Sequence, residues 1–185
     1  MATIFPLVVT TDGGLTGLGA ASPAPEVTGE SSEVCEKALE EATRLLPGCD
    51  ARMPATWLAK IGREFPHAPA ARAALDMAMH DLLARHLGVA VVDLLGRAHE
   101  ALPTSVTIGI LPVEEAVERA RAHVAAGFRA LKVKLGRFIE EDIERLRRIR
   151  EAVGQGAAGR PVAIRADANA GYAPAQLARL LAATS

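Results

Sequence analysis

The chain has 185 residues, half of them hydrophobic, and a formal net charge of −1, a composition typical of a globular protein of one or two domains. This balance argues against a nucleic-acid surface, and an aromatic content of 3% argues against base stacking. No run reaches membrane-spanning length, and no basic segment with a long apolar core opens the chain. Cys35 and Cys49 match no metal-binding spacing, so we expect reduced thiols in a cytoplasmic protein that binds neither nucleic acid nor membrane.

The first part of the chain is predicted to be one strand followed by helices. Residues 3–11 form a β-branched run, Asp-Gly-Gly at 12–14 indicates a tight turn, and a loop rich in glycine and proline follows to residue 31. Helical spacing of apolar residues then predicts three helices. The first starts near Ser32, and the other two cover 54–64 and 69–88.

The second part alternates strands and helices. Each strand-like run precedes an amphipathic segment, which is the signature of parallel βαβ units. The predicted strands cover 104–110, 128–136 and 160–172 with its exit loop, and the predicted helices cover 112–127, 139–153 and 173–184.

We therefore divide the chain into an α+β part, residues 1–103, and an α/β part, residues 104–185. A closed eight-stranded barrel needs roughly 200 residues or more, so three units form either a small open sheet or part of a barrel. We favour the incomplete barrel. Its unpaired strand edges predict self-association, and hence a homo-oligomer, or a partner that supplies further strands.

Two lysines alternate in the strand "LKVK". Lys132 and Lys134 share one face, while Leu131, Val133 and Leu135 share the other. Inside a barrel, like charge and desolvation would both lower the pKa of such a lysine toward that of a general base. On this strand alone, an edge strand whose solvated lysines deter sheet-to-sheet association is the commoner explanation.

The last predicted strand ends in "RADANAGY". Asp167 and Asn169 are predicted to share a face at its carboxyl end, where barrels hold their active sites. A carboxylate at this position can bind Mg²⁺, and the side-chain amide of Asn169 can make a supporting contact. Asp167 can equally be explained as a residue that caps or opens a turn. Tyr172 follows this turn and is a candidate for the mouth of the pocket.

Taken together, "LKVKLG" and "IRADANAGY" resemble the muconate-lactonizing and mandelate racemase branch of the enolase superfamily. The stretch "DGGLTGLGAASPAPEVTGES" is similar to the glycine-rich loop of that family's capping domain. Within the branch, "TSVTIGI" and "SPAPEVTGE" look most like dipeptide epimerases of the L-Ala-D/L-Glu type. The resemblance implies a partial capping domain over 1–103 and the first three βα units of an incomplete (β/α) barrel over 104–185.

The resemblance also implies a site and a reaction. Lys134 would be the acid/base that removes or returns the proton α to a carboxylate. Lys132 would adjust the pKa of Lys134 and contact the substrate. Asp167 would be one of three carboxylate ligands of Mg²⁺, Asn169 would support that site without binding the ion, and Thr107 would contact the substrate. The implied enzyme is a magnesium-dependent racemase or epimerase acting on a dipeptide or another small carboxylate.

The chain departs from the family pattern in two ways. Ala20 stands where the glycine-rich loop carries glutamate, and the remaining metal carboxylates and the opposing lysine belong to later strands that we do not find. We therefore expect an incomplete chain with weak activity or none. Muconate-type cycloisomerase, N-acylamino acid racemase, o-succinylbenzoate synthase and a non-catalytic remnant stay open as alternatives.

Overall fold

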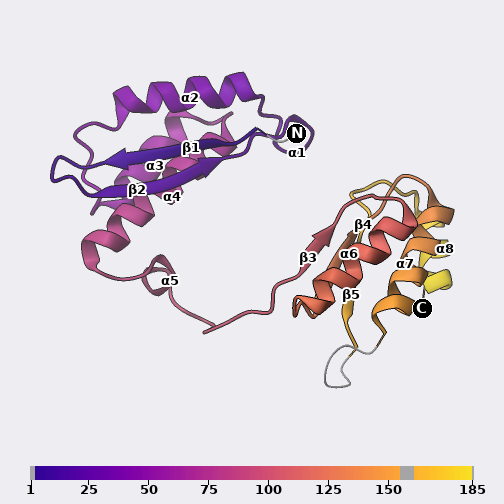
Figure 1. The fold of residues 1–185 in the computed structure, drawn as a ribbon. Coiled ribbons are helices and arrows are strands. Elements are labelled where there is room, and N and C mark those ends of the chain that lie inside the picture. The colour runs from indigo at the N-terminus through magenta and orange to yellow at the C-terminus, as the bar shows by residue number, and fades with distance from the viewer. Residues whose placement is uncertain (1–2, 155–160, 185) are drawn as a thin grey trace. The chain divides into compact units, whose positions relative to one another are not determined.

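The computed structural model describes residues 3–154 and 161–184 of the chain. It divides into two compact units, residues 1–98 (unit 1) and residues 99–185 (unit 2). Figure 1 shows both, and each is described by itself below. No helix within the described ranges is long and apolar enough to cross a membrane.

Unit 1 is a two-stranded antiparallel sheet packed with helices (Figure 1). The strands pair from Phe5 opposite Ala21 to Thr10 opposite Thr16. The long helix α4 packs along both strands and forms the centre of the unit. The elements are β1 (Phe5–Thr10), β2 (Thr16–Ala21), α1 (Pro25–Thr28), α2 (Ser32–Leu45), α3 (Pro54–Glu64), α4 (Pro69–Leu87) and α5 (Val91–Leu94).

The prediction of a glycine-rich loop after residue 14 was wrong for residues 16–21, which form strand β2. Glycine has low strand propensity, which hides the strand in the sequence. The structure supplies the reason for the glycines: a Cβ at Gly17 would collide with the carbonyl oxygen of Ala78, and one at Gly19 with that of Ala74. Strand β2 thus lies so close to α4 that only hydrogen fits between the two backbones.

A buried carboxylate begins α4. Glu30 is fully buried, and its carboxylate accepts hydrogen bonds from the backbone N–H groups of Ala70 and Ala71. These donors lie in the first turn of the helix, where they have no partner within the helix. Pro69 opens the same turn, and Ala68 before it offers no capping side chain. Glu30 therefore supplies the cap from a distant part of the chain.

The described residues of unit 2 form three parallel strands in the order β3-β4-β5, each followed by a helix, as predicted. Helices α6 and α7 pack against one face of the sheet and against each other (Figure 1). The elements are β3 (Val106–Ile108), α6 (Val113–Ala125), β4 (Ala130–Lys134), α7 (Ile139–Val153), β5 (Ala163–Asp167) and α8 (Pro174–Thr184).

Strand β4 is the middle strand of this sheet, so the edge-strand explanation for its two lysines was wrong. Leu131, Val133 and Leu135 are buried under the helices, while Lys132 and Lys134 point to the opposite face and are half-buried. Since β4 is paired on both sides, its lysines do not protect a free edge.

Replacing Gly19 should disrupt unit 1. We expect Gly19→Ala to lower the free energy of unfolding by about 3 kcal/mol or more, because backbone of α4 must move to admit the methyl group. Gly62→Ala in α3 is the matched control, since its Cβ would meet nothing within 4 Å; there we expect about 0.5–1 kcal/mol of stabilisation. Fluorescence of Trp57, the only tryptophan, reports the denaturant transition of unit 1. Equal stability of both variants would contradict the close approach.

Candidate active site at the carboxyl end of the parallel sheet

The lysine strand and the aspartate strand meet at one end of the sheet. Lys134 lies opposite Asp167 in the β4–β5 register, and Lys132 lies two residues earlier on the same face. The Nζ of Lys132 reaches along the strand to within 2.8 Å of Oδ2 of Asp167. Within the described residues the side chain of Lys134 makes no ion pair or hydrogen bond, so the site holds one lysine side chain that is ion-paired and one that is not.

The ion pair sets the charge state of Asp167. The hydrogen bond from Lys132, followed by the backbone N–H of Asn169, holds the pKa of this carboxyl below its ordinary value. The two side chains remain 41% and 27% exposed, so water screens the pair and its contribution to stability is small. Asp167 is thus an anion at neutral pH that a ligand can reach.

Asn169 lies in the turn after β5, so the prediction that it continues the strand face of Asp167 was wrong. Its backbone N–H donates to Oδ1 of Asp167 over 3.1 Å, and its side-chain amide donates to the Asp167 carbonyl over 3.3 Å. Asn169 and Ala170 both have positive φ, 47° and 58°. Asparagine tolerates this conformation, whereas alanine is strained in it. The turn anchors Asp167 instead of extending the strand.

Thr107 and Arg165 complete the exposed face of the sheet. Thr107 on β3 and Arg165 on β5 lie in register on either side of Lys132. Sequence reasoning singled out Thr107 and overlooked Arg165. Counting back two residues from Asp167 places Arg165 on the same face, so strand alternation was the signal that would have found it. The face therefore combines a hydroxyl, three basic side chains and one carboxylate.

A buried ion pair lies behind this end of the sheet. Asp142 and Arg145 of α7 are each 1% exposed and bind each other. Arg145 belongs to the arginine-rich stretch 145–150, which is polar by composition, yet its side chain is buried. Tyr172 donates its hydroxyl to Asp142, and burial together with this bond raises its pKa to about 12. The hydroxyl of the partly buried Tyr172 is therefore already engaged by Asp142.

The described residues fit Mg²⁺ only in part. The Asp167 carboxylate is the kind of hard oxygen ligand that Mg²⁺ prefers, and it is exposed enough to reach a metal ion. No group of three or more His, Cys, Asp or Glu side chains in the described ranges is arranged to hold an ion. The described residues thus supply one ligand and do not form a complete metal site.

Two further sets of polar or ionisable side chains have structural explanations. The Nδ1 of His80 lies 2.8 Å from Oδ1 of Asp76, and its ring meets Trp57 edge-on at 5.1 Å, which explains the pair as packing on α4. Cys35 and Cys49 are free thiols. Burial, with Glu30 nearby, raises the pKa of Cys35 to about 11, so this thiol is no nucleophile at neutral pH.

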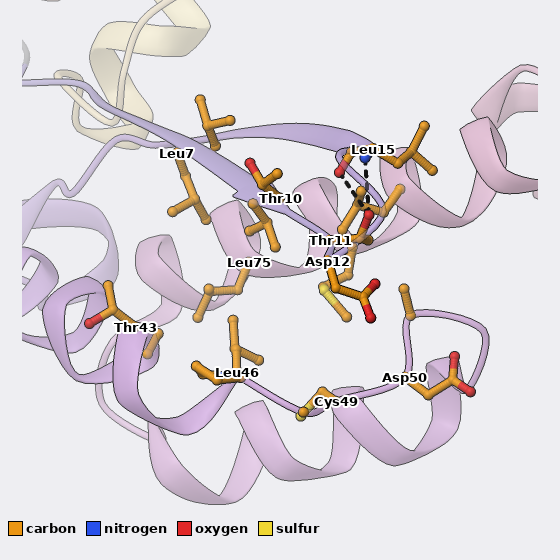
Figure 2. A pocket seen from close by; sticks show the side chains of 18 of the residues that line it. Leu7, Thr10, Thr11, Asp12, Leu15, Thr43, Leu46, Cys49, Asp50 and Leu75 are labelled. Carbon is orange, nitrogen blue, oxygen red and sulfur yellow. Dashed lines mark hydrogen bonds between the residues drawn. The ribbon is translucent and has the colours of Figure 1, made fainter.

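Unit 1 contains a cavity of about 980 Å³ between β1, the end of α2 and α4 (Figure 2). Much of its lining is apolar, with Leu7, Leu46 and Leu75 pointing into it (Figure 2). Two of its charged side chains already bind each other: Asp50 pairs with Arg52 over 2.7 Å, and this pair lowers the pKa of Asp50 to about 2. The cavity contains none of the predicted site residues, so it offers volume without catalytic chemistry.

Two family models match the chain. The model "Mandelate racemase / muconate lactonizing enzyme, N-terminal domain" matches residues 2–96, and "Enolase C-terminal domain-like" matches residues 115–185. The chain belongs to the mandelate racemase/muconate lactonizing enzyme family. This membership confirms the resemblance seen in the lysine and aspartate motifs, and it identifies unit 1 as capping-domain-like and unit 2 as part of an enolase-type barrel.

Family members with dipeptide-epimerase names are similar to the chain. The "L-Lys-D/L-Arg epimerase" of Methylococcus capsulatus is 52% identical over 93% of this chain and 47% of its own length. The "L-Ala-D/L-Glu epimerase" of Clostridium acetobutylicum is 33% identical over 94% and 47%. A solved Methylococcus capsulatus dipeptide epimerase, described as complexed with Mg and the dipeptide L-Arg-D-Lys, superposes with a TM-score of 0.88 at 49% identity, covering 97% of this chain and 49% of that one. The chain spans about half the length of these relatives.

The phenol of Tyr172 provides a direct check on the buried pair. Because it is the only tyrosine, tyrosinate absorbance in a pH titration reports this side chain alone. We expect a native midpoint near 12 and a midpoint near 10 in denaturant. Since the native pKa is the higher one, the associated stability is present below pH 10 and is lost as the pH rises toward 12. A native midpoint near 10 would contradict the buried contact with Asp142.

Proposed function

We propose that this chain carries the proton-transfer residues of a magnesium-dependent dipeptide epimerase. One observation carries the proposal: the ammonium of Lys132 is paired with Asp167, while Lys134 lies beside them unpaired, at the carboxyl end of parallel strands. Active sites of barrels lie at this end. The names of the similar family members support the assignment to epimerases.

The two lysines have different roles in this proposal. Lys134 in its neutral form removes the proton α to the substrate carboxylate and returns it to the same carbon. The intermediate is an enediolate, whose second negative charge must be stabilised for the weakly acidic proton to leave. Lys132 is held in place by its ion pair with Asp167, so its ammonium group supplies positive charge next to that anion.

Asp167 contributes one carboxylate ligand to Mg²⁺, and Asn169 fixes its orientation through the two hydrogen bonds of the turn. A bound Mg²⁺ would neutralise charge on the substrate carboxylate. Thr107 lies in register beside Lys132 and contacts the substrate. Because the described residues supply one metal ligand, we expect activity well below that of a complete site.

The substrate class is a dipeptide, and we favour a cationic one. The relative named for L-Lys-D/L-Arg is 52% identical to the chain, compared with 33% for the one named for L-Ala-D/L-Glu. This preference replaces the L-Ala-D/L-Glu type as the first substrate to test. The free thiols favour a cytoplasmic location.

We also propose a homo-oligomer, because β3 and β5 are the outer strands of the described sheet. Light scattering that finds a monodisperse monomer would contradict this.

The test follows α-proton exchange. We expect slow, Mg²⁺-dependent incorporation of deuterium from heavy water into an L-Lys-L-Arg dipeptide, monitored by NMR. Lys134→Ala should reduce the rate by about 100-fold or more, the usual effect of losing a general base. Lys37→Ala, an exposed lysine of α2 in unit 1, is the matched control and should exchange like the parent chain.

The stereochemical outcome sharpens this test. The sequence contains four lysines, and only Lys132 and Lys134 belong to unit 2. With bases on one face, deuterium should enter one stereoisomer without formation of the other epimer. Absence of exchange from the folded parent chain would overturn the proposal in favour of a non-catalytic protein.

A further inference from the structure

Two oppositely charged side chains of helix α7 are buried in unit 2. Asp142 and Arg145 lie three residues apart on α7, and each is 1% exposed. Removing such charges from water is costly unless each is paired and hydrogen-bonded, and a buried pair is often no more stable than an apolar replacement. Stability alone is therefore a weak reason for this pair.

The hydrogen bonds of the pair point to a different role. Asp142 accepts the backbone N–H of Gly136 over 2.9 Å and the hydroxyl of Tyr172. Arg145 donates from Nε to the carbonyl of Leu111 over 2.9 Å. Gly136 follows β4, Tyr172 follows β5, and Leu111 follows β3. One buried pair on α7 thus binds the exit segment of each of the three described strands of unit 2.

The exit segments also press against each other. Gly136 has a φ of +116°, and a Cβ there would lie 2.6 Å from the carbonyl oxygen of Ala168. A Cβ at Gly171 would lie 2.6 Å from the carbonyl oxygen of Gly136. One further backbone bond, from Leu135 N–H to the Asp167 carbonyl over 2.9 Å, joins the same two segments. A shift of one segment is therefore transmitted to the other.

We propose that Asp142 and Arg145 are positioning residues, which hold the ends of β4 and β5 in the register that places Lys132 and Lys134 against Asp167. This inference rests on the proposed function, because it concerns the geometry of that site. Neither residue contacts the site directly; each acts through Gly136, Tyr172 or Leu111.

Backbone amide hydrogen exchange, measured residue by residue by NMR on the whole chain, tests this. Tyr172→Phe removes one donor to Asp142 and keeps the ring, and Arg145→Lys keeps the charge but loses the planar guanidinium. In both variants we expect the amides of Leu135, Gly136 and Gly171 to exchange about tenfold faster. Arg148→Lys, on the same helix in an exposed ion pair with Glu114, is the matched control and should change none of them.

The opposite end of the same strands separates positioning from general stability. The amide of Ala163 donates to the Arg129 carbonyl at the amino end of the β4–β5 pair. Positioning predicts that exchange there stays within about twofold of the parent chain. Equal acceleration at Ala163 and at Gly136, or no acceleration at either, would overturn the inference. Since this measurement needs no turnover, its failure leaves the proposed epimerase function untouched, and absence of proton exchange in the dipeptide leaves the amide result standing.

Discussion

The parallel register between β4 and β5 is the constraint on which the candidate site depends. With Lys134 opposite Asp167, the two-residue period of the strand places Lys132 on the same face and within reach of that carboxylate. A slip by one residue would turn the lysines into the helix layer and expose Leu131 and Val133 instead. The apolar face, buried beneath α6 and α7, therefore fixes the chemistry of the opposite face.

The amino-acid pattern predicted those parts of the structure that follow from periodicity. Alternation in β4 located both lysines and the buried leucines, and the strand–helix rhythm predicted three parallel units. The turn after β5 was harder, because Asn169 continues the alternation in sequence while its positive φ takes it out of the strand. Local hydrogen bonds to Asp167 outweigh strand geometry there.

Features that depend on contacts between distant segments were not predictable in the same way. Gly17 and Gly19 lower strand propensity, and only the approach of α4 explains why β2 needs them. Arg145 belongs to a stretch of arginines that is polar by composition, yet it is buried because Asp142 and Leu111 bind it. A single sequence contains the residues of such a network without indicating which of them meet.

The cavity and the candidate catalytic residues belong to different units of the chain. The cavity of about 980 Å³ in unit 1 has an extensive apolar lining, which is the usual description of a ligand site. The open face of unit 2 has little enclosure but combines a free lysine, a paired lysine and a carboxylate. We assign the function to the face of unit 2, because removal of an α-proton needs a base beside charges that stabilise the resulting anion, and apolar side chains supply neither.

Backbone amide chemical shifts, recorded as an L-Lys-L-Arg dipeptide is added with Mg²⁺, test this assignment most directly. The account predicts changes at residues 107, 132–136 and 165–169, with the amides that line the unit 1 cavity unaffected. Changes confined to the cavity, around Leu7, Leu46 and Leu75, would contradict it.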